Sequence, residues 1–174
     1  MGGDVAVTPE QYVEGVQARL ASDGCNPRWE TWGWPVLVGR RADFKVQWFA
    51  TRLHLFTVVM AVPEVTLAAA QQFTVQAQQY AKDQKGGLPR GMQTGVAVFP
   101  ALVSSRVDPA ALAYAAQGQR VQFACMARPT VVDTTTGAVG AYRGNPMLGL
   151  IYAGYLRKKS ELYFPTPAGP GDDT

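Results

Sequence analysis

The chain has 174 residues, which is within the size range of a single domain and long enough to bury one substantial core. Hydrophobic residues make up 47% and charged residues 17%, a composition that excludes a largely disordered chain. The net charge is only +3, with acids interleaved among the bases. A dedicated nucleic-acid binder usually shows a stronger basic bias, so nucleic acid is not an expected partner.

The sequence contains no segment typical of export or membrane insertion. Its start, MGGDVAVTPEQ, has neither the cationic beginning nor the apolar core of a signal peptide. The longest apolar run, Leu53 to Val62, is about half of the roughly 20 residues that a membrane-spanning helix needs. Cys25 and Cys125 lie far apart in unlike contexts, so a disulfide framework is not expected. These features predict a soluble protein of the reducing cytoplasm without a membrane span.

The first predicted element is a helix. Thr8 has the position of an N-cap, Pro9 of the first helical residue, and Gln11 completes a capping box. Apolar residues then recur at helical spacing until Asp23-Gly24 ends the run.

The next segments favour strands. Trp29 to Arg41 alternates imperfectly and predicts one strand, in which Trp32, Trp34 and Val36 share a face, followed by a turn over 40–43. Residues 44–62 predict a bent pair of strands or a hairpin. From Leu55 to Val62 both faces are apolar, which indicates a central position in the sheet.

The longest predicted helix begins at Pro63 or Thr66, has an apolar stripe centred on Phe73, and ends at Gly86-Gly87. A basic loop separates it from a predicted strand over 96–103. Pro100 within that strand indicates a sheet edge or a bulge, because proline cannot donate a hydrogen bond to a neighbouring strand.

The remaining elements are shorter. Asp108-Pro109 predicts an N-capped helix through Ala116. A strand over 120–126 and a hairpin over 131–142 follow. Asn145-Pro146 predicts the start of a last helix, in which Leu148, Ile151, Tyr152, Tyr155 and Leu156 line one face.

Together these elements predict an α+β fold with a mostly antiparallel sheet and helices packed mainly on one face. Residues 1–164 are expected to form one domain, and residues 165–174, PTPAGPGDDT, a disordered tail. No glycine-rich dinucleotide fingerprint and no phosphate-loop motif occurs, which disfavours nucleotide sites of those two kinds.

Few residues suggest catalysis. His54, the single histidine, would be a general base near Asp43 or Cys125 in a functional interpretation. A histidine satisfied by a backbone group within the sheet is the favoured interpretation. One histidine and two distant cysteines do not make a standard zinc site. We therefore assign no catalytic residue, metal or cofactor.

Four tryptophans, at positions 29, 32, 34 and 48, occur within twenty residues. Trp32 and Trp34 would offer a stacking surface for a flat ligand or a sugar. The alternative, which we favour, is that these side chains pack in the core beneath the helices.

The basic loop is the strongest candidate for a ligand site. Its glycines, including Gly87 and Gly91, would let backbone N–H groups approach a ligand, while Lys85 and Arg90 supply charge for a carboxylate or phosphate. Arg52 from the adjoining strand would contribute. An irregular connection that needs glycine only to turn is an equally good interpretation.

Two functional hypotheses follow. The first is a non-catalytic binding or adaptor domain for a partner protein or a small anionic ligand. The alternative is an enzyme of unrecognised type that acts on an acidic or phosphorylated small molecule, using His54, Arg52 and Arg90. A pocket that brings those three side chains together would favour the enzyme.

Overall fold

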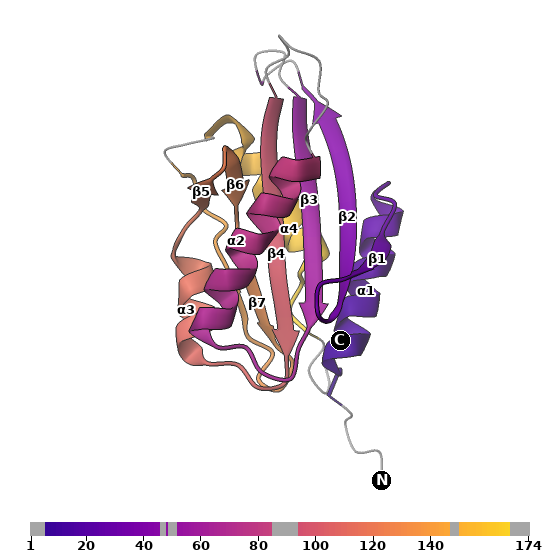
Figure 1. The fold of residues 1–174 in the computed structure, drawn as a ribbon, viewed down its shortest axis with the longest axis vertical. Coiled ribbons are helices and arrows are strands. Elements are labelled where there is room, and N and C mark those ends of the chain that lie inside the picture. The colour runs from indigo at the N-terminus through magenta and orange to yellow at the C-terminus, as the bar shows by residue number, and fades with distance from the viewer. Residues whose placement is uncertain (1–5, 46–47, 49–51, 85–93, 147–149, 168–174) are drawn as a thin grey trace, which may run out of the picture.

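One sheet with helices on both faces forms the centre of this protein, seen in a computed structural model that describes residues 6–45, 48, 52–84, 94–146 and 150–167 (Figure 1). The helices are α1 (Pro9–Ser22), α2 (Leu67–Gln84), α3 (Pro109–Gln117), the 3-10 turn η2 (Leu150–Tyr152) and α4 (Ala153–Tyr163). The strands are β1 (Arg28–Thr31), β2 (Pro35–Phe44), β3 (Arg52–Ala61), β4 (Thr94–Ser104), β5 (Arg120–Gln122), β6 (Cys125–Ala127), β7 (Thr130–Asp133) and β8 (Val139–Ala141).

The sheet is mixed. Its strand order is β1-β2-β3-β4-β6-β5, with β7 also beside β4 and β8 beside β7. Over the described residues, the four pairings β1/β2, β2/β3, β5/β6 and β7/β8 are antiparallel, and the three pairings that β4 makes are parallel. The predicted α+β class is confirmed, with antiparallel pairs in a small majority.

The parallel pair of β3 and β4 is the centre of the sheet, as the apolar run predicted. Every residue from Leu53 to Met60 is buried, and the register runs from Arg52 opposite Thr94 to Ala61 opposite Val103. Alternate side chains of these strands enter two separate cores, one on each face. A strand that is apolar on both faces needs cover on both.

Helices supply that cover on the two faces. Residues of α2 and α3 share one core, while residues of α1 and α4 belong to the other. Figure 1 shows α2 and α3 in front of the sheet and α4 behind it. The prediction that the helices pack mainly on one face is therefore wrong. The run of residues that is apolar on both faces was expected to need cover on its second face only locally, whereas α1 and α4 cover that face.

The tryptophan-rich segment is a hairpin, where the sequence predicted a single strand. The chain reverses between β1 and β2 at Gly33, whose φ of +79° lies in the left-handed region that glycine adopts without steric cost. The N–H of Trp32 donates to the carbonyl of Trp34 at 3.0 Å across this turn. The turn predicted over 40–43 is absent, and β2 continues through it to Phe44.

Pro100 lies inside the sheet, so the prediction of an edge is wrong. Strand β4 pairs with β3 on one side, where Pro100 is opposite Val58, and with β6 and then β7 on the other. Strands β6 and β7 pair with β4 in the same register, with Val98 opposite Ala127 and Ala101 opposite Thr130. Between these two pairs, Pro100 lies opposite Pro129. The N–H of Arg128 donates to the carbonyl of Val98 at 3.0 Å, but Pro100 has no N–H to donate the next ladder bond, so the break between β6 and β7 occurs beside a position that lacks a donor.

The helix starts were predicted from local sequence with mixed success. Thr8 caps α1 through a complete capping box, and the Asp108 side chain accepts from the N–H of Ala110 at α3. Helix α4 begins at Ala153, later than expected, while Leu148 lies outside the described residues. Within the described part of the chain, no helix is both long and apolar enough to cross a membrane.

Part of the predicted tail has a defined place. The hydroxyl of Tyr12 donates to the carbonyl of Pro165 at 2.8 Å, and Pro167 is buried. Residues 168–174 lie outside the described residues.

We expect Phe73→Ala to lower the free energy of unfolding by about 3 to 5 kcal/mol, because it deletes a buried aromatic side chain. Phe73 is 4% exposed in the core under α2. The matched control is Val75→Ala on the same helix, where the side chain is 42% exposed. Urea unfolding should separate the two variants clearly, and coincident midpoints would show that the stripe of α2 does not pack as described.

We expect truncation after Pro167 to leave the urea midpoint unchanged, whereas truncation after Phe164 should cost about 1 kcal/mol through loss of the Tyr12 acceptor. Tyr12→Phe, which removes only the donor, should reproduce much of that loss. Equal stability of both truncations would show that residues 165–167 contribute nothing to the fold.

Candidate functional site

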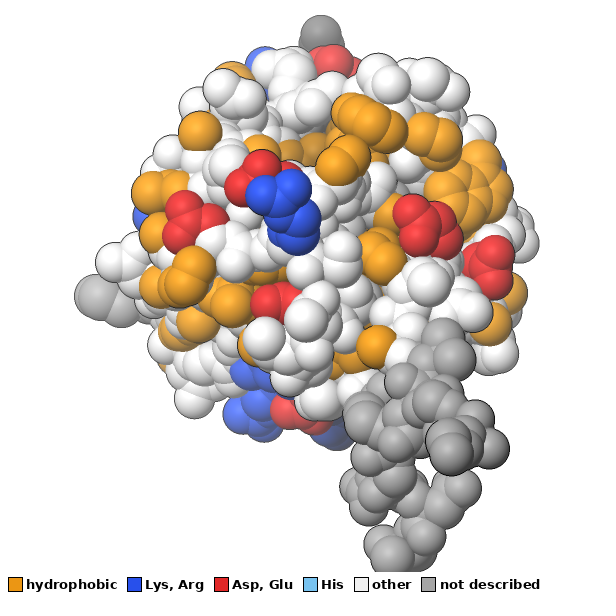
Figure 2. Space-filling model, turned by 90° about the horizontal axis from the view of Figure 1, so that it is seen from below, with side chains coloured by type: hydrophobic (Ala, Val, Ile, Leu, Met, Phe, Trp, Pro, Cys, Tyr) orange, Lys and Arg blue, Asp and Glu red, His pale blue; other side chains and the backbone are white. Residues whose placement is uncertain are grey.

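A cavity of about 480 Å³ opens at the end of the sheet where the parallel strands β3 and β4 finish. The start of α1 and the β1–β2 hairpin complete its wall. Figure 2 shows this end of the molecule, where hydrophobic side chains are exposed beside acidic ones. Ligands of open α/β sheets commonly bind beyond the carboxyl ends of parallel strands. The cavity is lined by Thr8, Pro9, Glu10, Val13, Glu14, Trp29, Trp34, Pro35, Ala61, Val62, Pro63 and Ser105.

Two tryptophans of the hairpin line this cavity. Trp29 is 48% exposed and Trp34 is 51% exposed. The tight turn at Gly33 places Trp34 at the hairpin tip, beyond the cover of the helices. Side chains of this size usually bury most of their surface, so two half-exposed tryptophans at one cavity are a candidate contact surface for a ligand.

Two carboxylates of α1 also line the cavity. Glu10 and Glu14 are four residues apart on the exposed face of the helix and therefore lie above one another. The hydroxyl of Thr8 accepts the Gln11 N–H at 3.1 Å and so serves the helix cap. The described lining residues include no lysine or arginine, and the two carboxylates give the cavity a negative charge.

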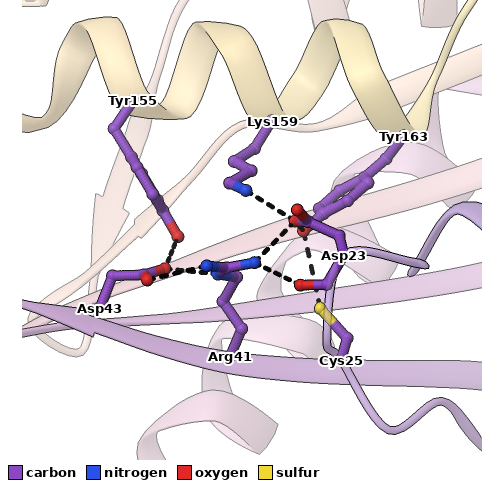
Figure 3. Close-up of polar contacts among 7 residues, drawn as sticks. All are labelled: Asp23, Cys25, Arg41, Asp43, Tyr155, Lys159 and Tyr163. Atoms are coloured by element: carbon purple, nitrogen blue, oxygen red, sulfur yellow. Dashed lines mark hydrogen bonds and ion pairs between the residues drawn. The ribbon is translucent and has the colours of Figure 1, made fainter. Parts of the chain in front are cut away.

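A second group of polar side chains gathers at the other end of α1, between β2 and α4 (Figure 3). The Arg41 guanidinium lies between two carboxylates. Its Nε is 2.5 Å and its Nη2 2.9 Å from the Asp43 carboxylate, and its Nη1 is 3.1 Å from Asp23 Oδ2. Lys159 Nζ lies 2.7 Å from the same Asp23 oxygen. We call this the Arg41 cluster, which consists of Asp23, Cys25, Arg41, Asp43, Tyr155, Lys159 and Tyr163.

Two tyrosines of α4 complete the cluster. The hydroxyl of Tyr155 donates to Asp43, and that of Tyr163 donates to Asp23. Cys25 Sγ lies 3.6 Å from the Tyr163 hydroxyl. These contacts join segments more than a hundred residues apart in the chain.

The cluster shifts the titration of its members. Hydrogen bonds from Arg41 lower the pKa of Asp43. Burial acts to raise the pKa of Asp23, but hydrogen bonds from Lys159 and Tyr163 outweigh it, so that this pKa is lowered as well. Burial, together with the neighbouring carboxylates, raises the pKa of Tyr155 and Tyr163.

The Arg41 cluster is therefore a self-contained network. Each of its charged groups is already matched by an opposite charge, and burial raises the pKa of the Cys25 thiol, which keeps it protonated and a poor nucleophile. These properties suit a link between α4 and β2 better than a reactive site.

Of the residues selected from the sequence as ligand-binding residues, the three that the structure describes, Trp32, Trp34 and Arg52, are not brought to one place. Trp34 lines the cavity, but Trp32 packs inward against Phe73 and Tyr80, with ring centroids 6.0 and 5.0 Å apart. Arg52 begins β3 opposite Phe44, at the far end of β2 from Trp34, roughly 30 Å away for ten residues at about 3.3 Å each. Lys85, Gly87, Arg90 and Gly91 lie outside the described residues.

His54 is buried within the sheet at 5% exposure, with its Nδ1 3.4 Å from Arg40 Nη2. It pairs with Ala42, so its side chain lies on the α2 face, while Asp43 joins the Arg41 cluster on the α4 face. The proposed pairing of His54 with Asp43 as a general base is therefore excluded by geometry.

Sequence reasoning missed Trp29, Glu10 and Glu14 as site residues. The spacing of the two glutamates on one exposed helix face was visible, but nothing local indicated that the hairpin tip would lie against that helix. Among the described residues, no three histidine, cysteine, aspartate or glutamate side chains are placed so that together they could hold a metal ion.

Comparison with known proteins gives no relative. No family model, no curated protein and no solved structure matches this chain.

We expect the stability of the fold to depend on pH through the Arg41 cluster. Asp23 and Asp43 have lowered pKa values when folded, so their contribution is present above the unfolded value, about 4, and is lost as pH falls through the folded values. The tyrosines have raised values, so their contribution is present below about pH 10 and is lost as pH rises further.

Urea midpoints measured across this pH range should therefore form a plateau that falls on both sides. Asp43→Asn should reduce the fall of the urea midpoint at acid pH, and Tyr155→Phe should reduce its fall at alkaline pH. Each variant should also have a lower midpoint than the parent on the plateau. Asp83→Asn, at an exposed position on α2, is the control. An acid limb with the same slope in Asp43→Asn and the parent would contradict the role assigned to the cluster.

Proposed function

We propose that this protein is a non-catalytic binding domain whose ligand site is the cavity beside α1 and the β1–β2 hairpin. The observation that carries the proposal is the combination, in one cavity, of two half-exposed tryptophans with two carboxylates. Its volume of about 480 Å³ suits a small molecule or one or two side chains of a partner protein.

The chemistry of the lining favours a ligand with a flat or apolar group and a positive charge. The face of an indole ring attracts a cation, and Glu10 and Glu14 would pair with it in the cavity. An anion, the ligand expected from the basic loop, would instead meet two like charges here. Amines and guanidinium groups of small molecules or of a partner's lysine and arginine side chains fit this description.

Binding is favoured over catalysis by the groups that line the cavity. The described lining residues include no histidine, cysteine or lysine, and the groups left for catalysis are the hydroxyls of Thr8 and Ser105 and the carboxylates of Glu10 and Glu14, which lie on the exposed face of α1. The Thr8 hydroxyl is used in the cap of α1. What the lining offers is apolar area and fixed charge.

The proposal is tested by titrating the protein with two soluble aromatic probes of opposite charge, phenethylammonium and phenylacetate. Binding is measured by the change in tryptophan fluorescence. We expect the cation to bind and the anion to bind at least about tenfold more weakly, a difference of about 1.4 kcal/mol. Trp34→Ala should lower the affinity for the cationic probe by about tenfold, because it removes one cation–π contact. Replacing Glu10 and Glu14 together by Gln should remove the preference between the probes.

Phe44→Ala is the matched control, since Phe44 is also an exposed aromatic residue, 53% accessible, but lies at the opposite end of β2. It should leave both titrations unchanged. Equal binding of the two probes, or an effect of Phe44→Ala as large as that of Trp34→Ala, would refute the assignment of this cavity.

A further inference from the structure

One edge of the sheet is open along the second half of β2. Strand β1 pairs with β2 only from Pro35 to Val38, whereas β3 pairs with it as far as Phe44. Residues 39–44 therefore have a neighbouring strand on one side only, over a length of about 20 Å at about 3.3 Å per residue. Figure 1 shows this part of β2 at the upper right of the sheet, above β1 and without a strand beyond it.

The backbone groups that face outward at this edge belong to alternate residues. In the hairpin, the N–H of Trp32 donates to the carbonyl of Trp34, so the even-numbered residues of β2 direct their N–H and C=O groups toward β1. Arg40, Ala42 and Phe44 continue this alternation and direct theirs away from the sheet. Outside the sheet, no backbone hydrogen bond reaches these three residues from the described part of the chain. A row of such groups is the pairing surface for an extended strand.

The side chains of the same residues lie on the α2 face of the sheet and are exposed. Phe44 is 53% accessible, and the Arg40 guanidinium lies 5.0 Å from the centroid of the buried Phe56 ring. Arg52, also exposed, is opposite Phe44 on β3. The ion pairs between described residues include neither Arg40 nor Arg52. This face of the edge therefore combines unmatched positive charge with an exposed aromatic ring.

The other face of the edge is already occupied. The side chains of Arg41 and Asp43 belong to the Arg41 cluster, which faces α4 (Figure 3). Beyond β2, Lys45 Nζ lies 5.3 Å from the ring centroids of both Trp48 and Tyr155, and Trp48 is buried in the core on this side. An added strand would thus be selected by its backbone and by the side chains that it presents on the α2 face.

We propose that residues 39–44 of β2 bind an extended acidic segment of a partner protein as an additional antiparallel strand. Backbone hydrogen bonds to Arg40, Ala42 and Phe44 hold the segment, an acidic side chain pairs with Arg40, and an apolar one covers Phe44. Antiparallel pairing is the more stable arrangement per residue. This site is separate from the cavity, which lies at the other end of β2 beside Pro35.

The chemistry of the edge favours this occupant over others. Joining two copies edge to edge about a two-fold axis would gather Arg40 and Arg52 of both copies on one face of a continuous sheet, and like charges there repel. Nucleic acids and lipids lack the alternating N–H and C=O groups that match a strand edge. An acidic segment in extended conformation satisfies both the backbone groups and the arginines.

The experiment measures binding of a fluorescein-labelled peptide, Thr-Val-Thr-Val-Thr-Glu-Thr, to the full chain by fluorescence anisotropy. In the antiparallel register its Glu lies opposite Arg40 and its central Val opposite Ala42. We expect saturable binding, and a loss of affinity of about tenfold or more when Lys replaces the Glu. N-methylation of the central Val, whose N–H faces β2, should cost about tenfold or more, whereas N-methylation of the next Thr, whose N–H points away, should leave the affinity unchanged.

Two variants of the protein test the same contacts. Ala42→Pro removes one outward N–H and leaves the N–H groups that bond β3, so it should fold and lose about tenfold or more in affinity. Arg40→Glu should bind the Lys peptide better than the Glu peptide, which reverses the parent's preference. Arg106→Glu, at an exposed arginine beyond the end of β4, is the matched control and should bind both peptides like the parent. Circular dichroism melts separate loss of binding from loss of fold.

Four outcomes would overturn the proposal. No binding of the Glu peptide at its highest soluble concentration would leave the edge without the assigned partner. Equal affinities of the two N-methylated peptides would show that the backbone ladder is not used. Equal affinities of the Glu and Lys peptides would remove the assignment of an acidic partner. A parent dimer in sedimentation equilibrium that Ala42→Pro abolishes would show that a second copy occupies the edge.

Discussion

The fold depends on the burial of β3 and β4 on both faces. Their side chains alternate between two cores, so neither face of these strands can be left in water without exposing a row of valine, leucine and phenylalanine side chains. The parallel pairing of β3 with β4 requires a crossover, and α2 provides it together with cover for one face. The other face must be covered by helices from the two ends of the chain, α1 and α4.

That arrangement explains why α1 has a different role at each end. Its first turn forms a wall of the cavity, while the segment after its last turn supplies Asp23 to the Arg41 cluster. Helix α4 reaches the same cluster through Tyr155, Lys159 and Tyr163. The cluster therefore ties the segment after α1 and helix α4 to the sheet, and the first turns of the same α1 carry Glu10 and Glu14, which line the cavity with the hairpin.

Local signals in the sequence were read correctly where the structure is local. The capping box at Thr8 and the Asp108 cap depend on residues within one helical turn. Errors arose where the outcome depends on distant residues. The alternation from Trp29 to Arg41 fits one strand as well as two, and only Gly33 marks the reversal. The Arg41 cluster joins positions 112 and 140 residues apart, which no spacing pattern reveals. Trp34 was chosen as a stacking residue for reasons that applied equally to the inward-facing Trp32.

The lengths of the outer strands restrict how this sheet can meet another polypeptide. One edge is formed by β1, with four residues, and by residues 39–44 of β2, which β1 does not cover; the other is shared by β5 and β8, with three residues each. The short strands β5 and β8 offer few free backbone groups, so a peptide gains little by adding itself as a further strand there. That edge is thereby protected from edge-to-edge aggregation, and the uncovered part of β2 is the longer stretch of edge at which another strand could pair.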